Sequence, residues 1–164
     1  MSVLARVVHL LSVSLWVGSV AFFSFVVAPA IFKALPKEQA GDVVGAIFPT
    51  YYWVGHLCGA VALGALLLAT RWDGWSVRAA SAGLVLVVML GANIYAGFVI
   101  QPKVHAVKSE MRQAEAPAQG VVPPPPYELK ERFDKYHKLS VQLNAVVLFG
   151  GFLVLILSSV GLKL

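Results

Sequence analysis

The chain has 164 residues, of which 59% are hydrophobic and only 13% are charged, and its formal net charge is +5. An ordinary soluble domain contains about 25% charged residues, so this composition excludes that class of protein. Basic residues that flank membrane helices account for the positive charge without a nucleic-acid partner. The single cysteine, Cys58, excludes an internal disulfide and a paired-cysteine metal or redox motif.

Four stretches contain no Asp, Glu, Lys or Arg, and each exceeds the about 20 residues that a helix needs to cross the hydrocarbon. They are Val7–Phe32, Val43–Thr70, Ala79–Pro102 and Leu139–Leu162. The alternation over about 10 residues that marks the strands of a β-barrel is absent. We therefore predict an all-α integral membrane four-helix bundle that forms one domain over residues 1–164. Its spans are expected at about 3–32, 50–71, 76–101 and 138–161.

The first span places His9 and Trp16 on a single helical stripe, which we expect to face the bundle. Pro29 should kink or end this helix near its far end. Residues 37–48 follow as a short segment with one apolar and one charged side. Because this segment is too short and too charged to span, we predict an amphipathic helix in the plane of the interface, separated from the second span by Pro49.

The second span opens with three aromatic residues, which we interpret as an interfacial belt: Tyr51, Tyr52 and Trp53. Small residues then form a strip for close helix packing: Gly55, Gly59 and Gly64. His56 lies within this strip. In the third span Asn93 sits deep, where an amide usually bonds to a neighbouring helix.

Helical periodicity continues beyond Pro102 and resumes at Tyr127, on the far side of a proline-rich stretch at 117–126. That stretch is typical of an extended polyproline-type linker. The second helical segment passes without a break signal into the fourth span. We therefore predict a helical hairpin over residues 103–137 that projects beyond the membrane.

A polar stripe enters the fourth span, because His137, Ser140 and Asn144 fall at i, i+3 and i+7 of a helix. Lipid cannot satisfy such groups, so the stripe must face protein, water or a ligand. Together with Asn93 it forms either the floor of a site or a hydrogen-bonded joint between bundle and hairpin. The sequence leaves both interpretations open.

The predicted topology places His56, His105 and His137 toward the hairpin and His9 near the opposite side of the membrane. Two kinds of site are compatible with this arrangement. His56 and His137, with His9 as a further candidate, could hold a b-type haem or form a quinone site. His56, His105 and His137 could instead hold a transition-metal ion. No His-x-x-x-His spacing is present, and isolated histidines that bond between helices explain the same pattern.

Several short runs carry a family resemblance. They are Leu15-Trp16-Val17-Gly18, Phe22-Phe23, Val27-Ala28-Pro29, Phe48-Pro49-Thr50-Tyr51-Tyr52 and Phe133-x-x-x-His137-x-x-Ser140-x-x-x-Asn144. Together they resemble the transmembrane protein 205-like family of small four-span proteins, a domain of unknown function. This resemblance implies the fold and a membrane location but no established reaction. His9 and Trp16-x-Gly18 are also faintly similar to copper-resistance D-type membrane proteins.

The spans contain no carboxylate, and the chain shows no nucleophile motif or phosphate-binding glycine loop. We therefore expect a non-enzymatic, multi-pass protein of the cell inner (plasma) membrane. It would act as an accessory subunit or a homo-oligomer, with lipid and other membrane subunits or a second copy as partners. One alternative is a redox protein that binds b-haem or quinone. The other is a metal or small-solute transporter whose path follows the polar stripe.

Overall fold

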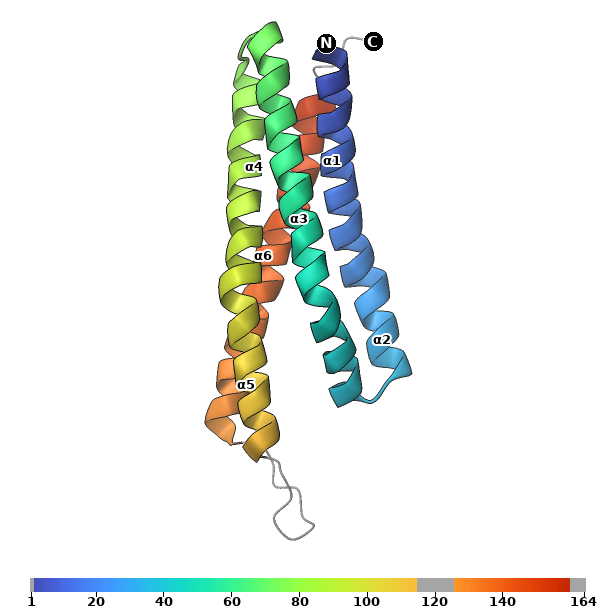
Figure 1. The fold of residues 1–164 in the computed structure, drawn as a ribbon, viewed down its shortest axis with the longest axis vertical. Helices are drawn as coiled ribbons and strands as arrows, with labels where there is room; N and C mark the ends of the chain where they lie inside the picture. The colour runs from blue at the N-terminus through green and yellow to red at the C-terminus, as the bar shows by residue number, and fades with distance from the viewer. Residues whose placement is uncertain (1, 115–125, 160–164) are drawn as a thin grey trace.

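The computed structural model describes residues 2–114 and 126–159, which form four antiparallel helical rods (Figure 1). Within these ranges four helices are long and apolar enough to cross a membrane, which confirms the predicted all-α membrane bundle. The rods run in chain order as α1 (Ser2–Phe22), η1 (Phe23–Val27) and α2 (Ala28–Ala34); α3 (Lys37–Asp73); α4 (Val77–Tyr95), η2 (Ala96–Ile100) and α5 (Gln101–Ala114); and α6 (Tyr127–Ser159).

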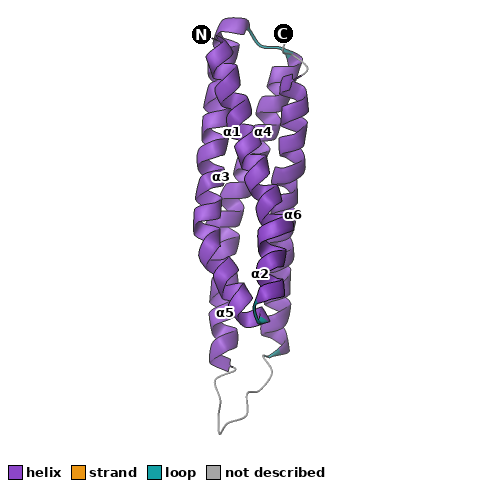
Figure 2. Ribbon diagram, turned by 90° about the vertical axis from the view of Figure 1, so that its right-hand side faces the viewer, coloured by secondary structure: helices purple, strands orange, loops and turns teal. Residues whose placement is uncertain are grey.

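The two ends of the bundle differ in shape (Figures 1 and 2). At the turn end lie the start of α1, the α3–α4 turn and the last residues of α6 that the structure describes. Gly74 closes α3 with a φ of +79°, and its N–H donates to the Thr70 carbonyl at 2.9 Å. Ser76 then caps α4, because its side chain accepts from the Ala79 N–H at 3.1 Å. These caps explain why the turn is short.

Two of the rods contain a π-helical turn just before a proline. In η1 the Ala28 N–H bonds to the Phe23 carbonyl, and in η2 the Gln101 N–H bonds to the Ala96 carbonyl. A proline ring clashes with the carbonyl four residues earlier. For Pro29 and Pro102 that carbonyl lies in the middle of the π-helix, so the wider turn absorbs the clash. Pro29 therefore does not end the first rod, which continues to Ala34.

The core of the turn-side half is packed closely around glycines. A Cβ atom at Gly59 would lie 2.8 Å from the Trp16 ring, which is only 1% exposed. A Cβ atom at Gly151 would clash with the Val17 side chain. These contacts bring α3 and α6 against α1. Gly59 of the predicted small-residue strip is therefore used inside the bundle.

The predicted in-plane helix over residues 37–48 requires correction, because these residues are the first turns of the continuous helix α3. Pro49 lies inside that helix and does not interrupt it. The apolar side of the segment is covered by protein, since Ala40 and Val44 are buried. Its acidic side faces basic residues of α5, and Asp42 pairs with Lys108 at 2.6 Å. Partners on α5 replace the lipid headgroups that the prediction assumed.

The described parts of the predicted hairpin are helical, since α5 and the first turns of α6 extend past the α2–α3 turn in Figure 1. Arg132 and Glu110 pair across it at 2.9 Å. The Lys103 ammonium lies 5.7 Å from the centre of the Tyr136 ring. Apart from Pro126, the predicted linker over 117–126 lies outside the described residues. We call this end of the molecule the hairpin end.

Candidate functional site

A cleft of about 260 Å³ lies in the hairpin-side half, between α3 on one wall and η2 with α5 on the other. Its rim is exposed, because Trp53 is 64% and Phe98 is 59% accessible. Both residues belong to stretches predicted to lie in the hydrocarbon, so the cleft opens toward lipid. The residues that line it are Pro49, Tyr52, Trp53, His56, Gly97, Phe98, Gln101, Pro102 and His105.

His56 is the most unusual residue of the cleft. Both ring nitrogens are buried, and neither has a hydrogen bond of normal geometry, although the Asn93 backbone carbonyl approaches the ring. The imidazole stacks on Phe98, with ring centres 5.1 Å apart and an angle of 16° between the planes. Trp53 meets it edge-on at 5.6 Å. Aromatic contacts therefore fix the ring while its polar atoms stay without partners.

The opposite wall of the cleft carries a hydrogen-bonded pair. The side-chain nitrogen of Gln101 lies 3.1 Å from Nε2 of His105, one helical turn away on α5. An amide nitrogen only donates, so Nε2 accepts and the neutral ring carries its proton on Nδ1. This pair leaves the Gln101 side-chain oxygen as an acceptor and the His105 Nδ1–H as a donor.

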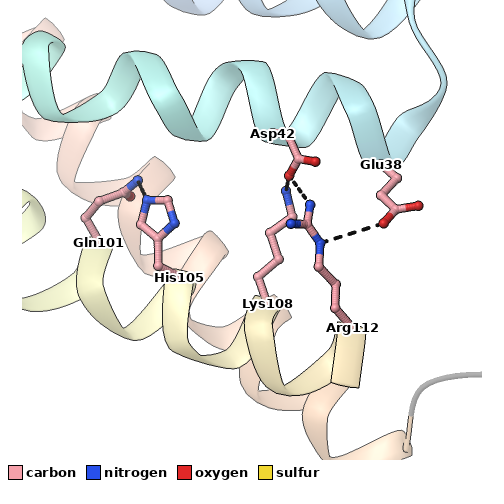
Figure 3. Close-up of polar contacts among 6 residues, drawn as sticks. All are labelled: Glu38, Asp42, Gln101, His105, Lys108 and Arg112. Atoms are coloured by element: carbon pink, nitrogen blue, oxygen red, sulfur yellow. Dashed lines mark hydrogen bonds and ion pairs between the residues drawn. The ribbon is translucent and has the colours of Figure 1, made fainter. Parts of the chain in front are cut away.

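Figure 3 shows that this face of α5 continues into a set of ion pairs with the start of α3. Lys108 and Arg112 both bond to the Asp42 carboxylate, and Arg112 also lies 3.7 Å from Glu38. We call these four residues the clasp. Because Gly41 lacks a side chain, the Lys108 ammonium can lie against the α3 backbone there. The clasp holds α3 and α5 together beyond the cleft.

The clasp also changes the acidity of its central carboxylate. Hydrogen bonds from Lys108 and then from Arg112 lower the pKa of Asp42 below its usual value of 3.8. Both bonds favour the ionised form, and they outweigh the small opposing effect of desolvation. Asp42 precedes the charge-free stretch of the second rod and is exposed. Asp42 is therefore ionised at any pH near neutrality.

The predicted polar stripe proves to be a hydrogen-bonded joint between α3 and α6. The Tyr52 and Ser140 hydroxyls lie 3.2 Å apart, and the Tyr51 hydroxyl donates to the Asn144 side-chain oxygen at 3.2 Å. The predicted amide of the third rod also bonds to α3, because Asn93 Nδ2 donates to the Tyr52 carbonyl at 3.1 Å. Ser140 and Asn144 of the predicted stripe are therefore bonded to α3, whereas His137 has no part in this joint.

His9 lies in the turn-side half and is only 3% exposed. Its Nδ1 bonds to the Ala62 carbonyl at 2.9 Å, and its Nε2 lies 3.0 Å from the Ser158 hydroxyl. A carbonyl only accepts, so Nδ1 carries the proton and Nε2 of the neutral ring accepts from Ser158. His9 also lines a second cavity of about 300 Å³, beside an ion pair between Arg6 and Asp73 at 3.0 Å. Both of its ring nitrogens are already used.

The structure brings together only part of the predicted histidine sets. His56 and His105 line the same cleft, but His137 lies exposed on α6 and stacks on Phe133 with ring centres 5.9 Å apart. In the part of the chain that the structure describes, no three His, Cys, Asp or Glu side chains form a group that could hold a metal ion. The predicted set of three histidines is therefore not assembled.

Two features of the site went unrecognised in the sequence. Two of the three residues of the predicted aromatic belt do not face outward, because Tyr51 and Tyr52 are buried and supply the partners of the polar stripe. The sequence could have indicated this burial, because the two tyrosines are at helical spacing from Gly55 and Cys58, which lie on the buried side of α3. In the sequence Gln101 was recognised only as the last residue of the third span. Its spacing of four residues to His105 could have indicated a hydrogen bond between the two side chains on one helix face.

Small residues also occur on the outer surface of the bundle. Gly18 on α1 and Gly64 on α3 have open space where a side chain would stand. Each is preceded by another small exposed residue one turn earlier, Ser14 and Ala60 respectively. Gly91 on α4 is open too, but the large residue Val87 lies one turn before it. Ser14–Gly18 and Ala60–Gly64 are thus small-residue strips on the described surface whose glycines contact nothing else in the bundle.

Comparisons with known proteins place the chain in an uncharacterised group. The model of a family described as "Domain of unknown function (DUF4149)" matches residues 11–113, a range that includes every residue of the cleft. An "Uncharacterized protein" of Aquifex aeolicus (strain VF5) is 32% identical over 146 residues, which cover 87% of this chain and 90% of that protein. No solved structure matches the chain.

Proposed function

The chain belongs to the family of the domain of unknown function DUF4149, and on that premise we propose that it acts non-enzymatically, by association within the membrane. It would be a homo-oligomer or an accessory subunit of a larger complex in the cell inner (plasma) membrane. The observation that carries this proposal is the pair of outward-facing small-residue strips, Ser14–Gly18 and Ala60–Gly64. The resemblance to the transmembrane protein 205-like family, and the fainter one to copper-resistance D-type proteins, remain expectations beside it.

The physical argument concerns how helices associate in lipid. Acyl chains are as apolar as leucine, so burial of apolar surface gives little driving force and close backbone packing must supply it. Ser14 and Gly18, like Ala60 and Gly64, are separated by one turn and let a partner helix approach the backbone. In contrast, Gly55 and Gly59 face Asn93 and Trp16 within the bundle. The two outward strips remain available to a partner.

The test is the oligomeric state in native lipid. The full chain would be extracted from its own membranes with surrounding lipid by a polymer, then weighed by native mass spectrometry. We expect wild type to appear as an oligomer or with a second protein, and Gly18→Leu or Gly64→Leu to reduce that species. Gly91→Leu is the matched control, because its outward site lacks a second small residue and should change nothing.

Two results would contradict association. One is a wild-type protein that is monomeric and without a protein partner in native lipid. The other is an assembly that survives both leucine variants unchanged. The transport alternative has less support, because Ser140 and Asn144 are already bonded to tyrosines of α3.

A further inference from the structure

His56 leaves a polar requirement in the cleft that the chain does not meet. A neutral imidazole has one N–H donor and one bare nitrogen acceptor. A buried polar group without a partner destabilises the fold, and lipid offers no water to replace the partner. Neither His56 nitrogen has a hydrogen bond of normal geometry, and the ring lies beside a cleft of about 260 Å³. Both nitrogens are enclosed, so the ring must turn toward the cleft before the oxygen of a ligand can bond to it.

The chemistry of the walls restricts what that ligand is. The described residues that line the cleft include no Lys, Arg, Asp or Glu, so the cleft has no ion to pair with a phosphate, a carboxylate or an amine. Its polar groups are a neutral imidazole on α3 and the Gln101–His105 pair on α5. The ligand is therefore uncharged and carries hydrogen-bonding groups toward both walls.

The shape of the cleft restricts the ligand further. Three aromatic rings line the cleft. The wall formed by η2 has no side chain at Gly97, where a Cβ atom would lie 3.1 Å from Tyr52 and 3.4 Å from His56. Sites for drug-sized ligands occupy about 300–1,000 Å³, so this cleft admits a single flat ring rather than a porphyrin. Its rim residues Trp53 and Phe98 face lipid, so the ligand enters from the bilayer.

We propose that the cleft binds the headgroup of a lipid-soluble quinone between His56 on α3 and the Gln101–His105 pair on α5. A quinone ring is flat and uncharged, and it carries oxygens at opposite ends. One carbonyl accepts from the His56 ring, and the other meets the Gln101–His105 pair. The isoprenoid tail leaves past Trp53 and Phe98 into lipid. The proposal concerns binding alone and does not depend on the association surface.

The donor and acceptor pattern also fits the reduced form of the same ligand. A quinol hydroxyl donates where a quinone carbonyl accepts. The bare nitrogen of His56 and the free Gln101 side-chain oxygen both accept, so either form finds partners after a shift of the imidazole proton. Few other neutral membrane compounds offer oxygens at opposite ends of one ring.

A photoreactive azidobenzoquinone with a short alkyl tail tests the site in the full chain, held in phosphatidylcholine nanodiscs. We expect saturable labelling that mass spectrometry maps to residues 49–56 or 97–105 and that excess unlabelled benzoquinone removes. Non-saturable labelling spread over the lipid-facing helices would overturn the proposal. This arm uses wild-type protein and so does not depend on the folding of a variant.

The His56→Phe variant keeps a ring to stack on Phe98 but removes both nitrogens. We expect half-maximal labelling to need about tenfold more quinone, the cost of one buried hydrogen bond. His137→Phe is the matched control, because that histidine is exposed on α6, outside the cleft, and its labelling should equal that of wild type. Circular dichroism would show whether both variants are folded. Labelling of folded His56→Phe at the wild-type concentration would overturn the proposal.

Discussion

Two histidines with enclosed ring nitrogens, one in each half of the bundle, have opposite surroundings. His9 in the turn-side half is bonded through both ring nitrogens, to α3 and to α6. His56 in the hairpin-side half has two buried ring nitrogens without partners, beside a cleft that opens toward lipid. His9 therefore completes its hydrogen bonds within the bundle, whereas the ring nitrogens of His56 have no hydrogen bond of normal geometry.

The difference teaches how to read a polar residue in a membrane helix. Burial alone does not separate the two histidines, because the ring nitrogens of each are enclosed. The two histidines differ in whether the protein supplies hydrogen-bond partners for their ring nitrogens. Trp16 is a useful contrast, since its indole N–H is also buried without a partner, yet the ring packs on Gly59 and does not line the cleft.

The largest expected effect comes from exchanging each histidine for an apolar residue of similar size. His9→Leu removes two hydrogen bonds between helices and should destabilise the protein by about 2 kcal/mol. His56→Phe breaks no bond of normal geometry, keeps the stacking on Phe98 and removes two poorly satisfied polar atoms, so the variant should be at least as stable as wild type. Thermal or denaturant unfolding in a mild detergent would measure both.

An equal loss of stability in both variants would break the comparison, because His56 would then be a bonded structural residue like His9. A third variant separates size from bonding at the turn-side position. His9→Gln retains an amide donor and acceptor, so it should recover part of the stability that His9→Leu loses. A glutamine variant no more stable than the leucine variant would show that packing, rather than hydrogen bonding, fixes His9.

A smaller effect should distinguish the glycines of the two halves. Gly59→Ala places a methyl group 2.8 Å from the buried Trp16 ring, and we expect a net loss of about 1 kcal/mol after the gain in helix propensity. Gly97→Ala meets its nearest neighbour, Tyr52, at 3.1 Å beside an open cleft, so its stability should change less. Unfolding midpoints under identical detergent conditions check the difference. Equal losses would mean that the cleft is packed as tightly as the turn-side core.

The four spans could be predicted because the free-energy cost of placing a charged residue in hydrocarbon depends on that residue and not on tertiary contacts. Four charge-free stretches of sufficient length predict four spans without any knowledge of tertiary contacts. The in-plane helix over residues 37–48 was predicted wrongly for the same reason. Its charges resemble an interface helix, whereas the residues that pair with them, Lys108 and Arg112, lie on α5 and are distant in sequence.

The candidate site could be predicted only in part. His56 and His105 were recognised from residue type and depth, and both line the cleft. Which histidine is bonded and which is not depends on how each helix is rotated, and a single sequence does not show rotation. The same limit applies to Tyr51 and Tyr52, which have the composition of an interfacial belt but face the core. Because they face the core, their hydroxyls bond to Ser140 and Asn144 of the polar stripe.

The smallest expected effect concerns the clasp, which couples the hairpin to α3 beyond the cleft. The folded pKa of Asp42 lies below its usual value of 3.8, so ionised Asp42 stabilises the clasp at every pH above that value. This contribution is lost only as the pH falls through the depressed folded pKa. Spin labels at Gln39 and Ser109 should therefore report an unchanged distance from pH 8 to about pH 5, the range in which this carboxylate stays ionised.

Asp42→Asn removes the charge at neutral pH and should broaden that distance distribution, because Lys108 and Arg112 lose their shared acceptor. Asp73→Asn is the matched control at the turn end, where it breaks the exposed pair with Arg6 and should leave the α3–α5 distance unchanged. Exposed ion pairs contribute about 0–1 kcal/mol, so we expect local opening rather than unfolding. A distance that stays narrow in Asp42→Asn would assign the α3–α5 contact to the buried side chains of Val44 and Val107 instead.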